Sequence, residues 1–129
     1  MVIETASPLG FDETIEKVIA NAKELGWKVP KKWSKNFQKN LKKVTGVDVG
    51  KNLVLKMCEP HAAAELLVHD EYKRFLATMP CSVAIYVKSD GKTYISMMNL
   101  NLIGTMYGGK MAELAEKLSP QMDKMRIME

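Results

Sequence analysis

Alternation of hydrophobic and polar positions is the clearest pattern in the middle of the chain. Residues 51–58, 81–88 and 92–98 each follow this period of two, which is typical of strands that are buried on one side. The sequence Ser-Asp-Gly at 89–91 separates the last two segments and is typical of a tight turn between paired strands. We therefore expect these three segments to form the centre of a sheet, with the last two joined as a hairpin.

A second pattern, in which apolar residues recur every three or four positions, predicts helices around these strands. It is clearest in residues 11–25, after which Gly26 is a typical helix stop. The same reasoning predicts shorter helices at 34–44, 62–68, 70–78 and 110–118, and short strands at 2–6 and 27–29.

Glycine and proline are expected to interrupt the C-terminal helices. Gly104 and the glycine pair at 108–109 should weaken any helix through the apolar segment 100–106. Pro120 should end the helix at 110–118, because proline lacks the backbone N–H that a helix interior needs.

The order of these elements, β-α-β-(helical insert)-β-(short helices)-β-β-α, indicates the α+β class. We expect a mostly antiparallel sheet with helices packed on one face. The length of 129 residues suits a single hydrophobic core. We therefore expect one domain over residues 1–129.

The predicted strand directions bring both cysteines to one end of this sheet. If the strands are antiparallel neighbours, Cys58 ends one strand where Cys81 begins the next. The third strand returns and brings Met98 and Asn99 to the same end. We expect a ligand or redox site built from Cys58, Cys81, Met98 and Asn99, in which Asn99 orients a polar group and Met98 supplies a soft contact.

The sequence leaves several uses of the two thiols open. They can be buried and unreactive, as free cysteines often are. They can instead cycle between dithiol and disulfide, or bind a cofactor or a soft metal such as Cu(I), which thiolate and thioether ligands suit. The candidate metal ligands are Cys58, Cys81, Met79 and His61.

Other chemistries find less support. The two cysteines and two histidines lack the short spacings of a structural zinc site. We find no Ser-His-Asp or paired-carboxylate arrangement to defend as catalytic. The sequence therefore identifies no cofactor and no catalytic residue, and leaves open whether the protein is an enzyme.

The positive charge of the chain is concentrated in one segment. The net charge is +4, and residues 28–43 contain seven lysines and no acidic residue. The alternative function is therefore a cofactor-free binding module that uses a lysine-rich helix at 31–43 for an acidic partner or nucleic acid. The candidate basic surface consists of Lys31, Lys35, Lys39, Lys42 and Lys43. This segment lacks arginine, which disfavours nucleic acid because base readout favours the bidentate guanidinium.

The sequence also bears on location. No apolar run approaches the roughly 20 residues that a helix needs to span a bilayer. The first residues lack the basic-then-apolar pattern of a secretory signal. We therefore expect a cytoplasmic protein without a membrane span. Thiols are normally reduced in the cytoplasm.

Several motifs of the chain resemble those of a known family. They are Cys58-x-Pro60-x-x-Ala63 followed by Leu66-Leu67, Met79-Pro80-Cys81, Asp90-Gly91-Lys92, and Tyr94-Ile95-Ser96-x-Met98-Asn99. With these motifs the sequence resembles the domain of unknown function 302 family over nearly its whole length, and more closely the cysteine-bearing archaeal and bacterial branch. The resemblance implies a β-α-β(4)-α order similar to the TATA-box-binding-protein-like fold. It also implies a homodimer, and it assigns no reaction.

Overall fold

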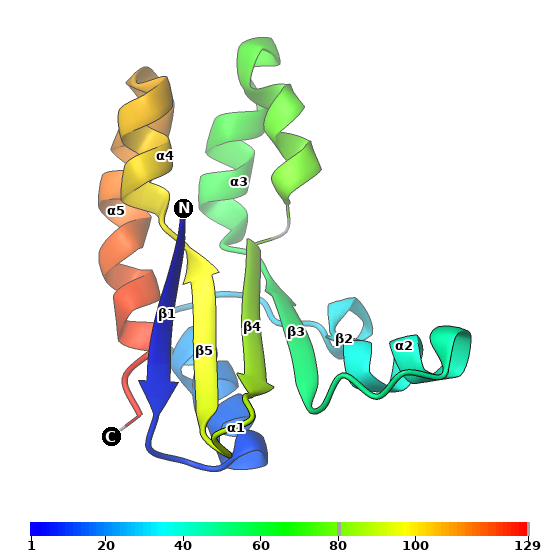
Figure 1. Ribbon diagram of the computed structural model, residues 1–129. Coiled ribbons are helices and arrows are strands. Elements are labelled where there is room, and N and C mark those ends of the chain that lie inside the picture. The colour runs from blue at the N-terminus through cyan, green and yellow to red at the C-terminus, as the bar shows by residue number, and fades with distance from the viewer. Residues whose placement is uncertain (80, 129) are drawn as a thin grey trace.

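The computed structural model describes residues 1–79 and 81–128 and is built on one five-stranded antiparallel sheet (Figure 1). The strands lie in the order β1 (Val2–Ser7), β5 (Thr93–Met98), β4 (Cys81–Val87), β3 (Asn52–Met57) and β2 (Lys35–Asn36). The predicted centre of the sheet is confirmed, because β4 pairs with β3 on one side and with β5 on the other.

The helices form two groups around this sheet. The long helices α1 (Phe11–Glu24) and α5 (Gly109–Met125) supply the residues that pack on one face of the sheet. In Figure 1, α3, α4 and the start of α5 extend beyond the end of the sheet where β5 stops, while α2 lies beside β3. The shorter elements are η1 (Lys31–Trp33), α2 (Phe37–Thr45), α3 (Pro60–Leu67), η2 (Asp70–Thr78) and α4 (Leu100–Tyr107). The expected α+β class is confirmed.

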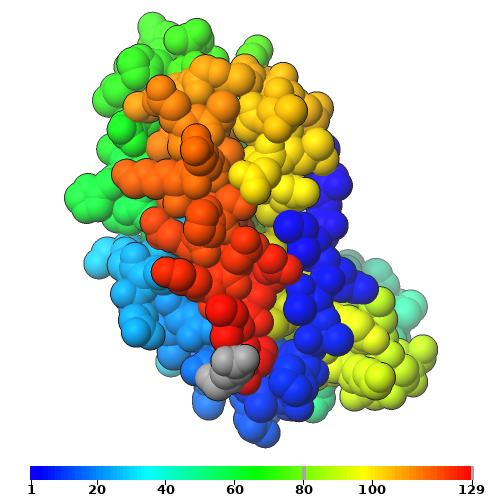
Figure 2. Space-filling model, turned by 90° about the vertical axis from the view of Figure 1, so that its left-hand side faces the viewer, coloured from blue at the N-terminus to red at the C-terminus, as the bar shows by residue number. Residues whose placement is uncertain are grey.

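The core lies between this covered face and the two long helices. Buried residues alternate with less buried ones along the central strands, as their hydrophobic pattern predicts. The buried apolar residues of these strands are Leu55, Met57, Val83, Ile85, Ile95 and Met97. They pack against Val18 and Ala22 of α1 and against Met122 and Met125 of α5. Figure 2 shows α4 and β1 along the same side of α5, with α4 beside its upper part and β1 beside its lower part.

The expected interruptions at Gly104 and Pro120 are wrong, whereas the glycine pair at 108–109 does separate α4 from α5. Helix α4 forms with Gly104 inside it, because Gly104 packs where α4 crosses α5: a Cβ atom added there would lie 2.7 Å from the Cβ of Ala115. Helix α5 runs through Pro120 to Met125. Pro120 is exposed, whereas Met122 and Met125 are in the core. Burial of these two side chains stabilises the helix although Pro120 lacks a backbone N–H.

Two shorter predictions also need correction. Residues 27–29 do not form a strand; Lys28 makes an isolated bridge to Cys58. The helix predicted at 34–44 begins at Phe37, because Lys35 and Asn36 pair with β3 as β2 and the Asn36 side chain then caps α2. Among the described residues, no helix is long and apolar enough to cross a membrane.

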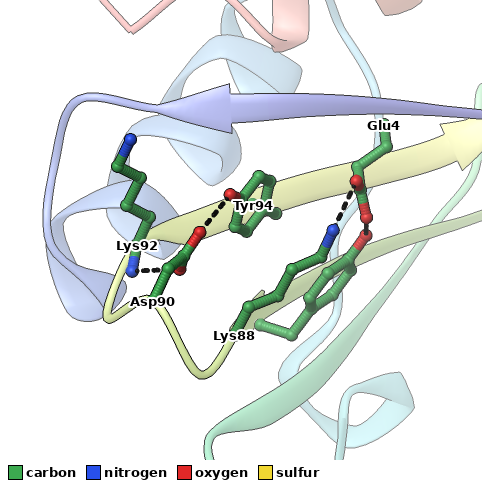
Figure 3. Close-up of polar contacts among 6 residues, drawn as sticks. Glu4, Lys88, Asp90, Lys92 and Tyr94 are labelled. Carbon is green, nitrogen blue, oxygen red and sulfur yellow. Dashed lines mark hydrogen bonds and ion pairs between the residues drawn. The ribbon is translucent and has the colours of Figure 1, made fainter.

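The other face of the sheet carries a polar cluster that ties β1 to β4 (Figure 3). Glu4 accepts hydrogen bonds from the hydroxyl of Tyr86 and, at 2.8 Å, from the ammonium group of Lys88. The Tyr86 ring stacks on that of Tyr94, with ring centroids 6.1 Å apart. The hydrogen bond from Lys88, then that from Tyr86, lowers the pKa of Glu4 below its ordinary value of 4.5.

We expect the Glu4→Gln variant to lose less stability on acidification than the wild type. A carboxylate with a lowered folded-state pKa stabilises the fold above its unfolded pKa, and this contribution is lost as the pH falls through the folded pKa. Urea unfolding at about pH 5 and about pH 3 measures the difference. Lys88→Met should also reduce the loss of stability on acidification, because the hydrogen bond from Lys88 is the largest cause of the lowered pKa of Glu4. An unchanged pH dependence in both variants would contradict this assignment.

Candidate functional site

A cavity of about 430 Å³ lies at the end of the sheet where β4 begins and β5 stops. We call it the main cavity. Its wall is formed by η2, the start of β4, the end of β5, α4 and α5. The helical hairpin of α4 and α5 closes one side of it, and the tight crossing at Gly104 and Ala115 holds these two helices together.

The lining of the main cavity is apolar and rich in sulfur. Six methionines line it, namely Met1, Met79, Met98, Met106, Met111 and Met122. Cys81 adds a thiol, and Thr78, Ser82 and Tyr107 are the lining residues with hydroxyl groups. No Asp, Glu, Lys, Arg or His is among the described residues that line this cavity. The wall therefore suits an apolar guest, and flexible methionine side chains can adapt to its shape.

A smaller hollow of about 70 Å³ adjoins the main cavity and contains both thiols. We call it the cysteine hollow. Cys58, Cys81 and Met79 line it, together with the buried Trp27 and Met57. Cys81 and Met79 also line the main cavity. The register places Cys81 opposite Met57, so Cys58 and Cys81 meet at the sheet end where the strand directions predicted them. Both cysteines are free.

The surroundings of both thiols disfavour the thiolate form. Burial raises the pKa of Cys81 above 9.0, and the neighbouring Cys58 raises it further against the smaller opposing effect of Lys56. Burial and then the charge of Glu59 raise the pKa of Cys58. Glu59 is fixed there because its carboxylate caps α3, accepting hydrogen bonds from the backbone N–H groups of His61 and Ala62. Raised thiol pKa values oppose the thiolate that redox exchange needs.

We expect both cysteines to react slowly with iodoacetamide at about pH 7.5, because the reactive thiolate is scarce when the pKa is raised. Mass spectrometry of timed samples measures the rate for each cysteine, and the same protein unfolded in urea gives the reference rate. The rates in the folded protein should increase with pH up to values above 9.0. Folded-state rates equal to or above the unfolded rates at about pH 7.5 would contradict the protonated state.

The remaining residues of the predicted sites lie elsewhere. Met98 lines the main cavity, but Asn99 does not; the Asn99 side chain accepts a hydrogen bond from the N–H of Leu102 and caps α4. His61 is exposed and lines neither hollow. Within residues 1–79 and 81–128, no group of three or more His, Cys, Asp or Glu side chains is placed to hold a metal ion.

Most of the main cavity comes from helices that the cysteine motifs do not predict. Phe75 of η2, Ile103 and Tyr107 of α4, and Met111 and Leu114 of α5 all line it. The spacing of Leu100, Ile103 and Tyr107 is a helical signal that was available in the sequence. Gly104 in the same segment opposes this signal, because glycine weakens a helix.

The lysine-rich range 31–43 does not form the predicted single helix, because it is divided among η1, β2 and α2, and it lies away from both hollows. All five lysines of the predicted basic surface are exposed. Phe37 and Leu41, which lie on the same helix α2, are 40% and 37% exposed. Helix α2 therefore presents both charge and apolar surface beside β3.

Comparison with known proteins supports one family. The family described as "Domain of unknown function DUF302" matches residues 3–127. Among solved structures, the chain is similar to the uncharacterized conserved protein DUF302 from Bacillus stearothermophilus, with 24% sequence identity and a TM-score of 0.77 over 97% of this chain and 98% of that chain. This structural likeness supports the fold. A search of curated proteins gave no match.

Proposed function

We propose that this chain, which belongs to the domain of unknown function 302 family, binds a small, predominantly apolar molecule in the main cavity. The name of the family assigns no reaction, so the site itself supports the proposal. The observation that carries this proposal is the apolar, methionine-rich wall of a cavity of about 430 Å³. This volume falls within the roughly 300–1,000 Å³ of typical small-molecule sites.

The state of the thiols supports apolar binding over redox exchange. A protonated, buried cysteine acts as a small apolar side chain with a weak donor. Cys81, which lines both hollows, has a raised pKa and is partly buried. In this proposal Cys81 and Met98 contact the bound molecule, Met79 shapes the wall between the two hollows, and Cys58 packs behind them.

The test is binding of the neutral fluorescent probe N-phenyl-1-naphthylamine, whose emission rises in apolar surroundings. We expect saturable binding to the wild type and a loss of affinity of about tenfold or more in Ile103→Trp, because the larger ring occupies the main cavity. Leu102→Trp is the matched control: Leu102 is its neighbour on α4 and does not line the cavity.

Equal affinity in the two tryptophan variants would contradict this location for the site. Absence of saturable binding to the wild type would contradict the proposal as a whole. Thermal unfolding of both variants checks that each is folded before the affinities are compared.

Soft-metal binding at the cysteine hollow is a second candidate, favoured by one observation. Cys58, Cys81 and Met79 line the same small hollow, and two thiolates with a thioether suit Cu(I). Titration of the reduced protein with Cu(I) against a chromophoric chelator tests this candidate. One equivalent should bind to the wild type and none to Cys81→Ser. Equal Cu(I) binding by both proteins would contradict it.

The basic surface remains the alternative function. Its support is that Lys31, Lys35, Lys39, Lys42 and Lys43 are all exposed and form no ion pair within the described residues. Retention on an anionic matrix that falls steeply with salt would support an acidic partner. Passage through the matrix at low salt would contradict this alternative.

The expected homodimer stays a prediction. The sheet face that bears the partly buried, stacked rings of Tyr86 and Tyr94 also carries Val2, which is 64% exposed. Sedimentation equilibrium should give twice the chain mass of 14.5 kDa. A mass of one chain at micromolar concentration would contradict the homodimer.

A further inference from the structure

A lysine lies at the rim of the main cavity. Lys56 of β3 and Ser82 of β4 are directly opposite each other in the sheet. The ammonium group of Lys56 donates a hydrogen bond of 2.6 Å to the hydroxyl oxygen of Ser82. Ser82 lines the main cavity, although Lys56 itself does not. The wall of the cavity is mostly apolar. The ammonium group of Lys56 is thus hydrogen-bonded to Ser82, one of the few polar side chains in that wall.

The charge of Lys56 has no partner of opposite sign in the described part of the chain. None of the ion pairs there includes Lys56. The lysine is partly buried. An anion placed beside Lys56 and Ser82 would be bound by charge-assisted hydrogen bonds, which are stronger than neutral ones.

The pair lies at the sheet part of the cavity wall, whereas apolar side chains of the helices form another part. Leu118 and Met122 line the cavity on the core side, whereas Ser82 and Met98 belong to its strand side. An elongated molecule can therefore place an apolar part among the helix residues and a charged end at Lys56.

We propose that the molecule bound in the main cavity is an amphiphile with one anionic group, such as a carboxylate, and that Lys56 and Ser82 bind this group. The inference rests on the proposed function and adds the chemical class of the ligand. The apolar chain occupies the cavity, and the anionic end accepts hydrogen bonds from the ammonium and hydroxyl groups at the rim.

The test compares decanoate with decanol, which have the same chain length and differ in charge. Displacement of N-phenyl-1-naphthylamine measures the affinity of each. Decanoate should bind to the wild type more tightly than decanol, and Lys56→Met should weaken decanoate by about tenfold while leaving decanol nearly unchanged. Ser82→Ala should weaken decanoate in the same direction by a smaller factor. Added salt should weaken decanoate and leave decanol nearly unchanged.

Two controls make the result specific. Lys51→Met removes an exposed lysine next to β3 that lies away from the main cavity, and it should leave decanoate binding unchanged. Acetate, which carries the head group alone, should not displace the probe; displacement by acetate would contradict the need for an apolar chain. Retained decanol binding shows that Lys56→Met is folded.

The outcomes separate the two proposals. If decanol and decanoate both bind and Lys56→Met does not weaken decanoate, the anionic class of ligand is wrong and the apolar site stands. If neither compound nor the probe binds to the wild type, both proposals are wrong.

Discussion

Replacing Trp27 with alanine should lower the free energy of unfolding by about 3–5 kcal/mol, the largest loss that we expect from any variant described here. Trp27 is 2% exposed and belongs to the core between α1, the sheet and α5. Its indole N–H donates a hydrogen bond of 2.7 Å to the side-chain oxygen of Gln121. The substitution therefore removes a large apolar side chain and leaves Gln121 without this partner.

The effect of Trp27→Ala should also be large because the space cannot easily be refilled. Trp27 already borders the cysteine hollow of about 70 Å³, so truncation enlarges an existing void, and larger residual voids cost more stability. Urea unfolding measures the change. Trp33→Ala is the matched control, since Trp33 is only partly buried and lies outside both core clusters. Losses of the same size in both variants would contradict this placement of Trp27.

Replacing Gly104 with alanine should lower the free energy of unfolding by about 1–3 kcal/mol, as overpacking does in other cores. The sign of this change is informative, because replacing glycine with alanine inside a helix ordinarily increases the free energy of unfolding by about 0.5–1 kcal/mol. Here the added Cβ would lie 2.7 Å from the Cβ of Ala115 and 3.2 Å from the Cα of Ala112. Helices α4 and α5 must separate to accept it.

A double-mutant cycle isolates this contact. Ala115→Gly in the Gly104→Ala background removes the nearer of the two atoms, so the two changes together should cost less than the sum of the separate losses. Additive losses would contradict a direct clash between the two helices. Gly104 and Ala115 lie where α4 and α5, which form one side of the main cavity, cross each other. Separation of the two helices in Gly104→Ala should therefore also weaken binding of N-phenyl-1-naphthylamine.

The sheet and the meeting of the cysteines were predictable from the sequence because they depend on short-range patterns. Alternation sets which side chains are buried, and the hairpin at 89–91 sets the direction of β5. Given the further assumption that β3 and β4 are antiparallel neighbours, Cys58, Cys81 and Met98 come to one end of the sheet, as the structure has them. The sequence left buried, unreactive thiols as one of several alternatives, because the raised pKa of Cys58 depends on burial and on the capping position of Glu59.

The main cavity was not predictable because tertiary packing decides the helices that build it. Gly104 normally weakens a helix, but here it permits the close crossing with Ala115. Pro120 normally ends a helix, but the burial of Met122 and Met125 carries α5 past it. The local preference of each residue disfavours a helix at its position, and the packing of α4 and α5 overrides that preference.

The measurement that tests the apolar site most directly is the NMR spectrum of protein labelled with ¹³C on its methionine methyl groups. The chain has ten methionines, and six of them line the main cavity. On titration with decanol, the methyl signals that shift most should belong to these six, identified by single Met→Leu variants. Met97 and Met128, which do not line the cavity, should shift little. An unchanged spectrum at saturating decanol, or shifts that are largest at Met97 and Met128, would contradict a ligand site in the main cavity.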